Sequence, residues 1–273
     1  MKTRLFIICM LATVLSVQAH EPNVHLHINP KWKECSFQID PSLTQAQWNQ
    51  FTNEAGMVAY LRSLDDARPL GRGNYEVSIL QWNTSINEED DAWNNTFVHP
   101  DSAHWLIGGE HLPFPGLLIK AGISKKFDVA GYYTYRAGAN YGVFGAQLQW
   151  NAINDTAKQW ALSSRLNFTH LYGPEDLTFS VYGIDCIASK TIPLFKPWAS
   201  ISPYAGGSVS FTHAHEKTEV VNLHDENVTG LRGLAGVSLQ LAMIRIGLEY
   251  NVAEVNSFNY KIGARFGIHS KKK

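Results

Sequence analysis

The stretch Phe258-Asn259-Tyr260-Lys261-Ile262-Gly263-Ala264-Arg265-Phe266-Gly267-Ile268 decides the fold. Each even position in it is apolar, and each odd position is polar, charged or glycine. Successive side chains of a β-strand point to opposite faces, so this period of two predicts a strand with one apolar and one polar face. The preceding stretches, 244–252 and 231–241, alternate in the same way, with Leu234 as an exception.

The alternation continues toward the N-terminus. It is visible in the stretches 75–79, 117–124, 127–134, 144–151, 159–168, 177–182 and 200–211. Together these stretches predict about ten strands, within a range of eight to twelve, and therefore an all-β fold class.

A soluble β-sandwich has the same alternation, but two features favour a membrane barrel. The first is that aromatic residues gather at the strand ends, where the interfacial girdles of a membrane barrel require them. These residues are Tyr75, Trp82, Tyr141, Trp150, Trp160, Phe168, Tyr250, Phe258 and Phe266.

The second feature is that the connections alternate in length. Tight turns at 124–126, 154–156 and 242–243, and a longer link at 189–198, alternate with connections that include long loops at 87–116 and 213–227. Short turns at one end are typical of an outer-membrane barrel with both chain ends in the periplasm. Because an open sheet edge would leave backbone groups unpaired in hydrocarbon, we predict a closed, antiparallel, up-and-down transmembrane barrel over residues 74–268.

The first 19 residues have the pattern of a secretory signal peptide. A short start with the basic residues Lys2 and Arg4 precedes the apolar run 5–17, and Val17-Gln18-Ala19 is a small-x-small cleavage site. The run is too short for a membrane-anchoring helix, which needs roughly 20 apolar residues. We therefore expect an exported mature chain that starts at His20.

Residues 20–73 lack the alternation of the barrel. Ser42-x-x-Gln45 fits a capping box, and apolar residues follow from Trp48 at steps of three and four, so we predict a short helix near 42–64. This N-terminal segment would lie in the periplasm or pack against the barrel mouth. At the other end of the chain, residues 269–273 form a basic tail.

With its signal peptide, its two-residue period over residues 74–268 and a last strand ending near Phe266, the chain resembles the bacterial outer-membrane β-barrel proteins. The resemblance implies the outer membrane of a Gram-negative cell as the location. It also implies outer-membrane lipid and the barrel assembly machinery as partners. It points to no particular subfamily, substrate or ligand.

A formal net charge of −1 offers no electrostatic case for binding nucleic acid. The mature chain keeps Cys35 and Cys186. Exported proteins can keep disulfides, and the sequence leaves open whether these two cysteines pair.

Charged residues also occur on the face of the predicted strands that points inward. They are Glu76, Lys120, Asp128, Arg165, Arg232, Arg245, Glu249, Lys261 and Arg265. They form either a network of ion pairs that fills the lumen or the lining of a selective conduit, because charges there must be paired or hydrated. We favour the network, since side chains nearly fill a barrel of about eight strands and open pores need about sixteen.

Histidines cluster twice, and both clusters are conceivable metal sites. One cluster is His20, His25 and His27, and the other is His213, His215 and His224 in a predicted outer loop. His-x-His on an extended segment puts both imidazoles on one face, where they can chelate zinc or copper. The second cluster supplies the metal candidates, but no complete ligand set is evident, and we expect no cofactor.

The alternative function is a hydrolase or lipid-modifying enzyme at the barrel rim. Its candidate acid–base groups are His224-Asp225, Asp90-Asp91, His104 and His111. The sequence has neither Gly-x-Ser-x-Gly nor His-Glu-x-x-His. We therefore expect a non-enzymatic role, which is structural, a narrow transport path or adhesion.

Overall fold

The computed structural model describes residues 34–87, 89–98, 111–195 and 198–267. The predicted signal peptide, the N-terminal histidines, His104 and the tail 269–273 lie outside these residues. Within them, no helix is both long and apolar enough to cross a membrane.

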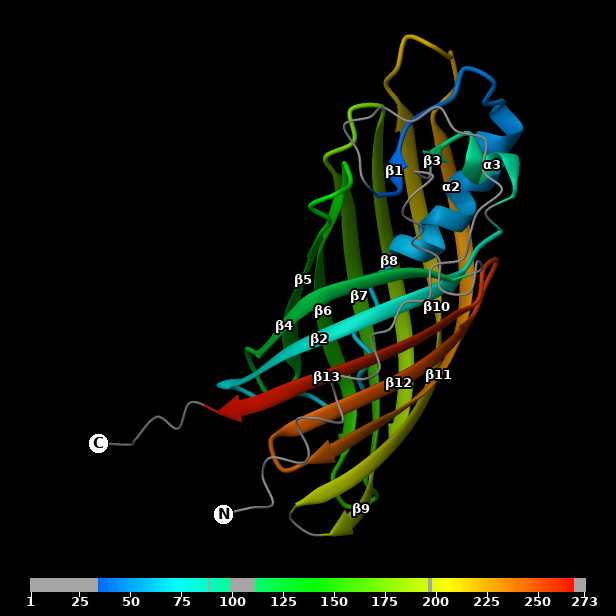
Figure 1. The fold of residues 1–273 in the computed structure, drawn as a ribbon. Helices are drawn as coiled ribbons and strands as arrows, with labels where there is room; N and C mark the ends of the chain where they lie inside the picture. Colours follow the sequence, from blue (N-terminus) through cyan, green and yellow to red (C-terminus); the bar gives the residue numbers. More distant parts are fainter. Residues whose placement is uncertain (1–33, 88, 99–110, 196–197, 268–273) are drawn as a thin grey trace.

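Ten strands of the described chain form the wall of a barrel (Figure 1). They are β2 (Asn74–Ser85), β4 (His111–Gly122), β5 (Phe127–Tyr135), β6 (Gly142–Asp155), β7 (Trp160–Tyr172), β8 (Leu177–Lys190), β10 (Ala199–Glu216), β11 (Glu226–Leu241), β12 (Ile244–Val252) and β13 (Ser257–Gly267). Each strand pairs antiparallel with the next, and β13 pairs with β2, which closes the sheet. The predicted closed, antiparallel, up-and-down barrel of about ten strands is confirmed.

The two ends of the barrel carry different connections. At what we call the turn end, the connections are 123–126, 156–159, 191–198 and 242–243. At the loop end they are 86–110, 136–141, 173–176, 217–225 and 253–256, so this end holds short connections as well as long ones. The two predicted long loops are shorter than expected, because β4 already begins at His111 and β10 continues to Glu216. A further strand, β9 (Ile192–Phe195), lies within the predicted link 189–198 and pairs with the start of β10.

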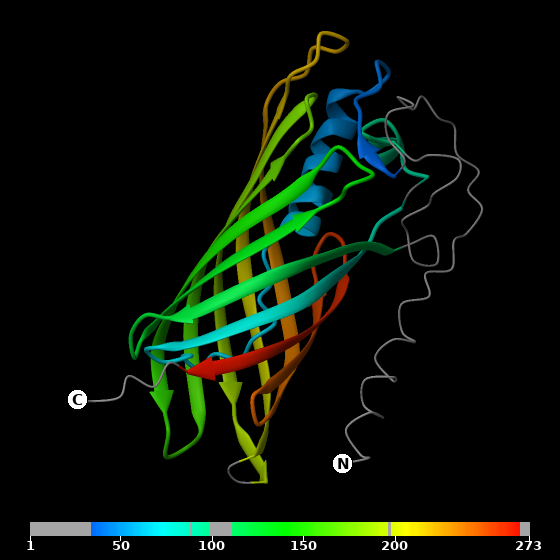
Figure 2. The same cartoon turned by 60° about the vertical axis from the view of Figure 1, so that its left-hand side comes forward.

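The N-terminal segment lies at the loop end. Its helix α2 (Gln45–Ala59) sits inside the barrel and packs mainly against β10 and β11 (Figures 1 and 2). The helix is shorter than the predicted 42–64, because its capping box is formed by Thr44 and Gln47 and the backbone turns extended at Tyr60. Beside it lie β1 (Ser36–Phe37), which pairs with β3 (Phe97–Val98), and the short helix α3 (Asp91–Asn94).

An apolar core fills the loop-end half of the lumen. Phe51 of α2 meets Trp93 of α3 at a ring-centroid distance of 5.1 Å, and Phe37 meets Tyr141 at the same distance. Trp82 and Tyr141 are 0% and 3% exposed, so their predicted place in the outer girdle is wrong. In this half of the barrel the inward face of the strands is apolar like the outward face, because it packs against the N-terminal segment rather than facing water.

The outer face of the barrel is apolar, as lipid contact requires. Exposed large side chains include Ile79, Ile119, Tyr133, Phe144, Trp150, Leu166, Ile184, Phe211, Leu231, Leu248, Tyr250, Phe258 and Phe266. The exception Leu234 faces inward instead and joins a small buried cluster with Ala67, Ala161, Ile187 and Tyr204. Its break in the alternation therefore marks contact with the N-terminal segment.

The orientation of β13 gives a residue-by-residue test. Ile262 is 37% exposed on the outer face, whereas Lys261 is 1% exposed inside. In a background with both native cysteines replaced, a cysteine at position 262 should react with a lipid-phase label. A cysteine at position 261 should not. The opposite labelling pattern would mean that β13 is turned by one residue and exposes its cations to lipid, which costs roughly 2–4 kcal/mol for each at mid-bilayer.

Candidate functional site: a plug held by buried ion pairs

The chain that follows α2 runs through the lumen to the turn end. Residues 60–67 are all buried, and Leu70 and Gly71 lie against β4 and β5 at the start of the barrel wall. We call residues 45–70 the plug, which comprises α2 and this extended segment. The sequence predicted a helix near 42–64 here, in a segment that lies in the periplasm or packs against the barrel mouth, and not an extended stretch that runs through the lumen.

Asp65 is the centre of the contacts between plug and wall. Its carboxylate lies 3.3 Å from the Nζ atom of Lys120 on β4 and 3.6 Å from the Nε atom of Arg245 on β12. It also accepts a hydrogen bond from Lys261 on β13. All four side chains are nearly sealed from solvent, so each charge depends on the others for compensation.

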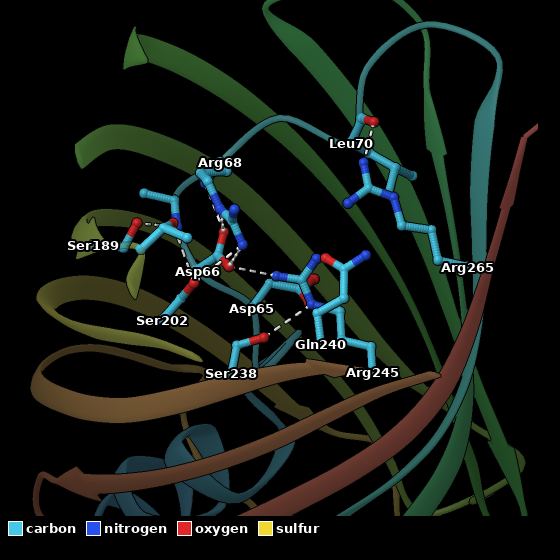
Figure 3. Close-up of polar contacts among 12 residues, drawn as sticks. Asp65, Asp66, Arg68, Leu70, Ser189, Ser202, Ser238, Gln240, Arg245 and Arg265 are labelled. Atoms are coloured by element: carbon cyan, nitrogen blue, oxygen red, sulfur yellow. Dashed lines mark hydrogen bonds and ion pairs between the residues drawn. The ribbon is translucent and has the colours of Figure 1, made fainter. Parts of the chain in front are cut away.

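Asp66 extends the same contact to a second carboxylate. It accepts a 2.7 Å hydrogen bond from Arg245 and a 3.0 Å hydrogen bond from Arg68 (Figure 3). Arg165 on β7 donates instead to the backbone carbonyls of Asp65 and Asp66, at 2.8 and 3.2 Å. The two consecutive aspartates are thus held through both their side chains and their backbone.

Two acids of the wall complete this group. Glu76 on β2 lies 2.7 Å from Lys261, and Asp128 on β5 lies 3.7 Å from Lys120. We call the eight residues the belt: Asp65, Asp66, Glu76 and Asp128 with Lys120, Arg165, Arg245 and Lys261. These eight charges balance, four against four, and Arg68 of the plug adds a fifth cation beside Asp66. Without the plug the wall alone would keep four cations against two acids, which is a local excess of two positive charges.

A second contact lies nearer to α2. The Tyr60 hydroxyl donates to Asp185 on β8 at 2.6 Å, and Arg232 on β11 donates to the same carboxylate at 3.1 Å. The Arg232 guanidinium also lies 4.2 Å from the centroid of the Tyr60 ring. Gly183 makes room for this ring, because a Cβ atom there would come within 2.3 Å of it.

The backbone of the plug is strained next to the belt. Leu64 has φ of +52°, a left-handed conformation that is uncommon for a branched side chain. Its carbonyl oxygen lies close to Gly247 of β12, where an added Cβ atom would come within 2.5 Å of that oxygen. Such strain persists only where surrounding contacts over-determine the conformation, and here the belt supplies them.

The structure thus places eight of the predicted inward charges inside the lumen, each at most 5% exposed. Arg265 is half-buried and donates to the Leu70 carbonyl. Six of the nine belong to the belt, whereas Glu249 accepts from Tyr204 at 3.0 Å. Sequence reasoning missed their chief partners, because Asp65 and Asp66 lie outside the alternating strands.

The histidine cluster at the loop end does not converge. His213 hydrogen-bonds to Asn227 at 3.0 Å, and His215 hydrogen-bonds to Asp225 at 2.6 Å, which lowers the pKa of that carboxyl group. His224 lies in the adjoining loop. In the part of the chain that the structure describes, no group of three or more His, Cys, Asp or Glu side chains is placed to hold a metal ion.

The rim candidates for catalysis have other partners. Asp90 caps α3 and accepts from Gln50 at 2.9 Å, and His111 hydrogen-bonds to Ser85 at 3.1 Å. A pair that the sequence did not suggest is His170 on β7 and Ser180 on β8, whose Nδ1 and Oγ atoms lie 2.8 Å apart. Cys35 is buried and Cys186 is exposed, and no disulfide joins them.

The family model described as "Family of unknown function (DUF6588)" matches residues 73–267. No curated protein shows a significant match to the sequence.

Three of the similar solved structures are outer-membrane barrels. The β domain of the Bordetella autotransporter BrkA is 10% identical, with 72% of this chain and 100% of that chain covered and a TM-score of 0.40. An outer membrane channel of Pseudomonas putida F1 is 10% identical, with 74% of this chain and 98% of that chain covered and a TM-score of 0.37. Neisserial surface protein A is 17% identical, with 72% of this chain and 97% of that chain covered and a TM-score of 0.31. With TM-scores below 0.5, these likenesses carry no functional argument for this chain.

The belt predicts that Asp65 controls how firmly the plug is held. Replacing one partner of a buried ion pair leaves an uncompensated charge, at a cost of roughly 3–5 kcal/mol. Asp65→Asn should therefore lower the free energy of opening of residues 60–67, measured by amide hydrogen exchange in folded protein. Asp225→Asn, at an exposed loop carboxylate, is the matched control and should change nothing. Unaltered exchange in Asp65→Asn would show that the belt does not hold the plug.

Proposed function

The chain belongs to the family of unknown function DUF6588, and we propose that it is a non-enzymatic outer-membrane barrel. Its own plug closes the barrel at rest, and displacement of the plug opens a narrow conduit. The observation that carries this proposal is the belt, in which the plug supplies two carboxylates to a ring of cations drawn from β4, β7, β12 and β13.

The outward face supports the membrane location. On β10, outward positions are apolar or small from Ile201 to Phe211, and His213 follows. Ten residue steps at about 3.3 Å, tilted by roughly 40°, give a height of about 25 Å, which matches the apolar band of outer-membrane barrels. The polar row of His170, Ser180, His213 and Asn227 then lies at the loop-end border of this band.

The two barrel ends suggest the orientation. The barrel begins at Asn74 and finishes at Gly267, both at the turn end, which in this fold faces the periplasm. The loop end then faces outward, and α2 with it. The plug therefore spans the lumen from the outer mouth to the periplasmic side. At the turn end a recess of about 210 Å³, lined by Arg68, Pro69, Asp155 and Arg265 among others, adjoins the plug.

The chemistry of the belt favours a gate over a permanent filling. Buried ion pairs contribute little net stability, because the desolvation of both ions offsets their attraction. Well-packed apolar residues would seal the lumen more firmly, as they do around α2. Charged contacts combined with a strained Leu64 instead hold the plug in one position at a modest net gain, so a moderate force or ligand suffices to displace it.

One observation favours a second candidate, a hydrolase of ester lipids at the membrane surface. The His170–Ser180 pair lies on the outer face of the barrel, where an imidazole could accept the proton of a serine nucleophile. Within residues 34–87, 89–98, 111–195 and 198–267, no carboxylate is hydrogen-bonded to His170. Ester hydrolysis that vanishes in Ser180→Ala would establish this candidate, and an inactive parent protein would remove it.

Conductance in planar bilayers tests the gate directly. The parent protein should be nearly silent, because the belt is intact. Asp65→Asn/Asp66→Asn should conduct in small steps and should prefer anions, since the wall keeps its excess of two positive charges. The Asp225→Asn control should remain silent. Steady conductance of the parent protein, or silence of the double variant with a plug shown to be mobile, would contradict the proposal.

A further inference from the structure

The recess at the turn end brings two arginines to one cavity. Its volume of about 210 Å³ is several times the space that one water molecule needs. Arg68 of the plug and Arg265 of β13 both line it, and Figure 3 shows them with their partners Asp66 and Leu70. The rest of the lining is Pro69 and four residues of the hairpin between β6 and β7, which are Asn154, Asp155, Thr156 and Gln159.

Arg265 has no acidic partner in the described chain. Its guanidinium donates to the backbone carbonyl of Leu70, which carries no full charge. Within residues 34–87, 89–98, 111–195 and 198–267, no carboxylate lies within 4.0 Å of it. The charge of Arg68 is close enough to repel it. A half-buried cation in this setting gains from a counter-charge.

Arg68 has an acidic partner but keeps part of its guanidinium free. Its Nε and Nη2 atoms donate to Asp66, at 3.3 and 3.0 Å, and Nη2 also donates to Ser202 at 3.1 Å. The Nη1 atom makes no hydrogen bond to any residue that the structure describes. Since the side chain is 27% exposed, this second terminal nitrogen can meet a ligand.

The charges around the recess are unequal. The belt is balanced in itself, so Arg68 and Arg265 add two positive charges beside it, and Asp155 adds one negative charge. The Asp155 Oδ1 atom already accepts from the backbone N–H groups of Ala157 and Lys158, at 3.0 and 2.8 Å. This carboxylate therefore serves the turn, and the recess keeps a surplus of one positive charge.

Neutral donors and exposed cations surround this surplus. The side chains of Asn154 and Thr156 make no hydrogen bond within the described residues, so an amide and a hydroxyl group are available in the lining. Lys125, Lys126 and Lys158 are exposed on the turn-end connections, and the described parts of these connections hold no acidic residue. Cations around a mouth steer anions toward it.

We propose that the recess binds a small oxyanion, a carboxylate or a phosphate, that enters from the turn end. A guanidinium presents paired N–H donors whose spacing matches the oxygens of either group. Arg265 supplies the uncompensated charge. The Nη1 atom of Arg68, the Asn154 amide and the Thr156 hydroxyl supply further donors. The site does not require the plug to move, so it stands apart from the gate.

Titration calorimetry of the full chain in detergent tests the site, with succinate and inorganic phosphate as the probes. At least one of them should bind the parent protein saturably, and the tighter of the two shows whether the recess prefers a carboxylate or a phosphate. Succinamide has the shape of succinate without its charge and should not bind. Lack of saturable binding of both probes at millimolar concentration would overturn the proposal.

Thr156→Asp places a negative charge inside the recess and should weaken binding of the probe at least about tenfold. Ala157→Asp is the matched control, because it adds the same charge to an exposed residue of the same turn that does not line the recess. It should keep most of the affinity. Both variants should fold, since the two positions are exposed.

Arg265→Gln removes the uncompensated cation. It should weaken binding roughly tenfold or more, because a hydrogen bond to a charged group is lost. Equal weakening in Thr156→Asp and Ala157→Asp would show diffuse attraction to a basic surface in place of a site. That result, or unchanged affinity in Arg265→Gln, would overturn the proposal.

Discussion

The contact of the Asp65 carboxylate with Lys120, Arg245 and Lys261 is the interaction on which the interior of this barrel depends. It links the N-terminal segment to β4, β12 and β13, which lie in the continuous stretch β12-β13-β2-β4 of the wall. Since all of these groups are buried, none of the cations can exchange the carboxylate for water. The position of the plug in the lumen therefore depends on charge, because the plug lies where its two aspartates meet the cations of the wall.

The lumen has an apolar half and a charged half, and the plug makes apolar contacts in one and ion pairs in the other. Near the loop end, α2 buries Trp48 and Phe51 among apolar residues of the wall, as in the core of a soluble protein. Nearer the turn end, Asp65 and Asp66 meet a charged wall. The apolar half provides most of the burial that holds the segment, and the charged half fixes its depth. A gate needs this combination, which is a stable attachment at one end and a contact of small net energy at the other.

The fold was predictable because the wall obeys one rule. Alternation in β13, β12 and β11 indicated strands, and the closure of a barrel in lipid fixed their antiparallel, edge-free arrangement. The inward charges could be assigned from the same parity. The pairing partners could not, since Asp65 and Asp66 lie in a stretch without periodicity, and only a lumen that holds this stretch gives them cations to meet. Trp82 and Tyr141 were misplaced for the same reason, because apolar residues on a barrel wall indicate lipid only when nothing apolar fills the inside.

Leu234 shows what the sequence did contain. Its apolar side chain on a polar face looked like noise in the alternation, yet it packs in one cluster with Ala67 of the plug. Runs such as Leu177, Phe179 and Val181 on β8 are buried in the same core as α2. Read together with an amphipathic stretch before the first strand, such inward apolar positions are a usable sign that a barrel is filled by its own chain.

A double-mutant cycle between Asp65 and Lys261 measures most directly whether buried ion pairs hold the plug. The quantity is the free energy of opening of residues 60–67, obtained by hydrogen exchange for Asp65→Asn, Lys261→Met and the double variant. If the two side chains interact as the structure shows, the double variant should lose roughly 1–3 kcal/mol less than the sum of the single losses. Additivity within about 0.5 kcal/mol would contradict the contact and, with it, the closed barrel proposed for this chain.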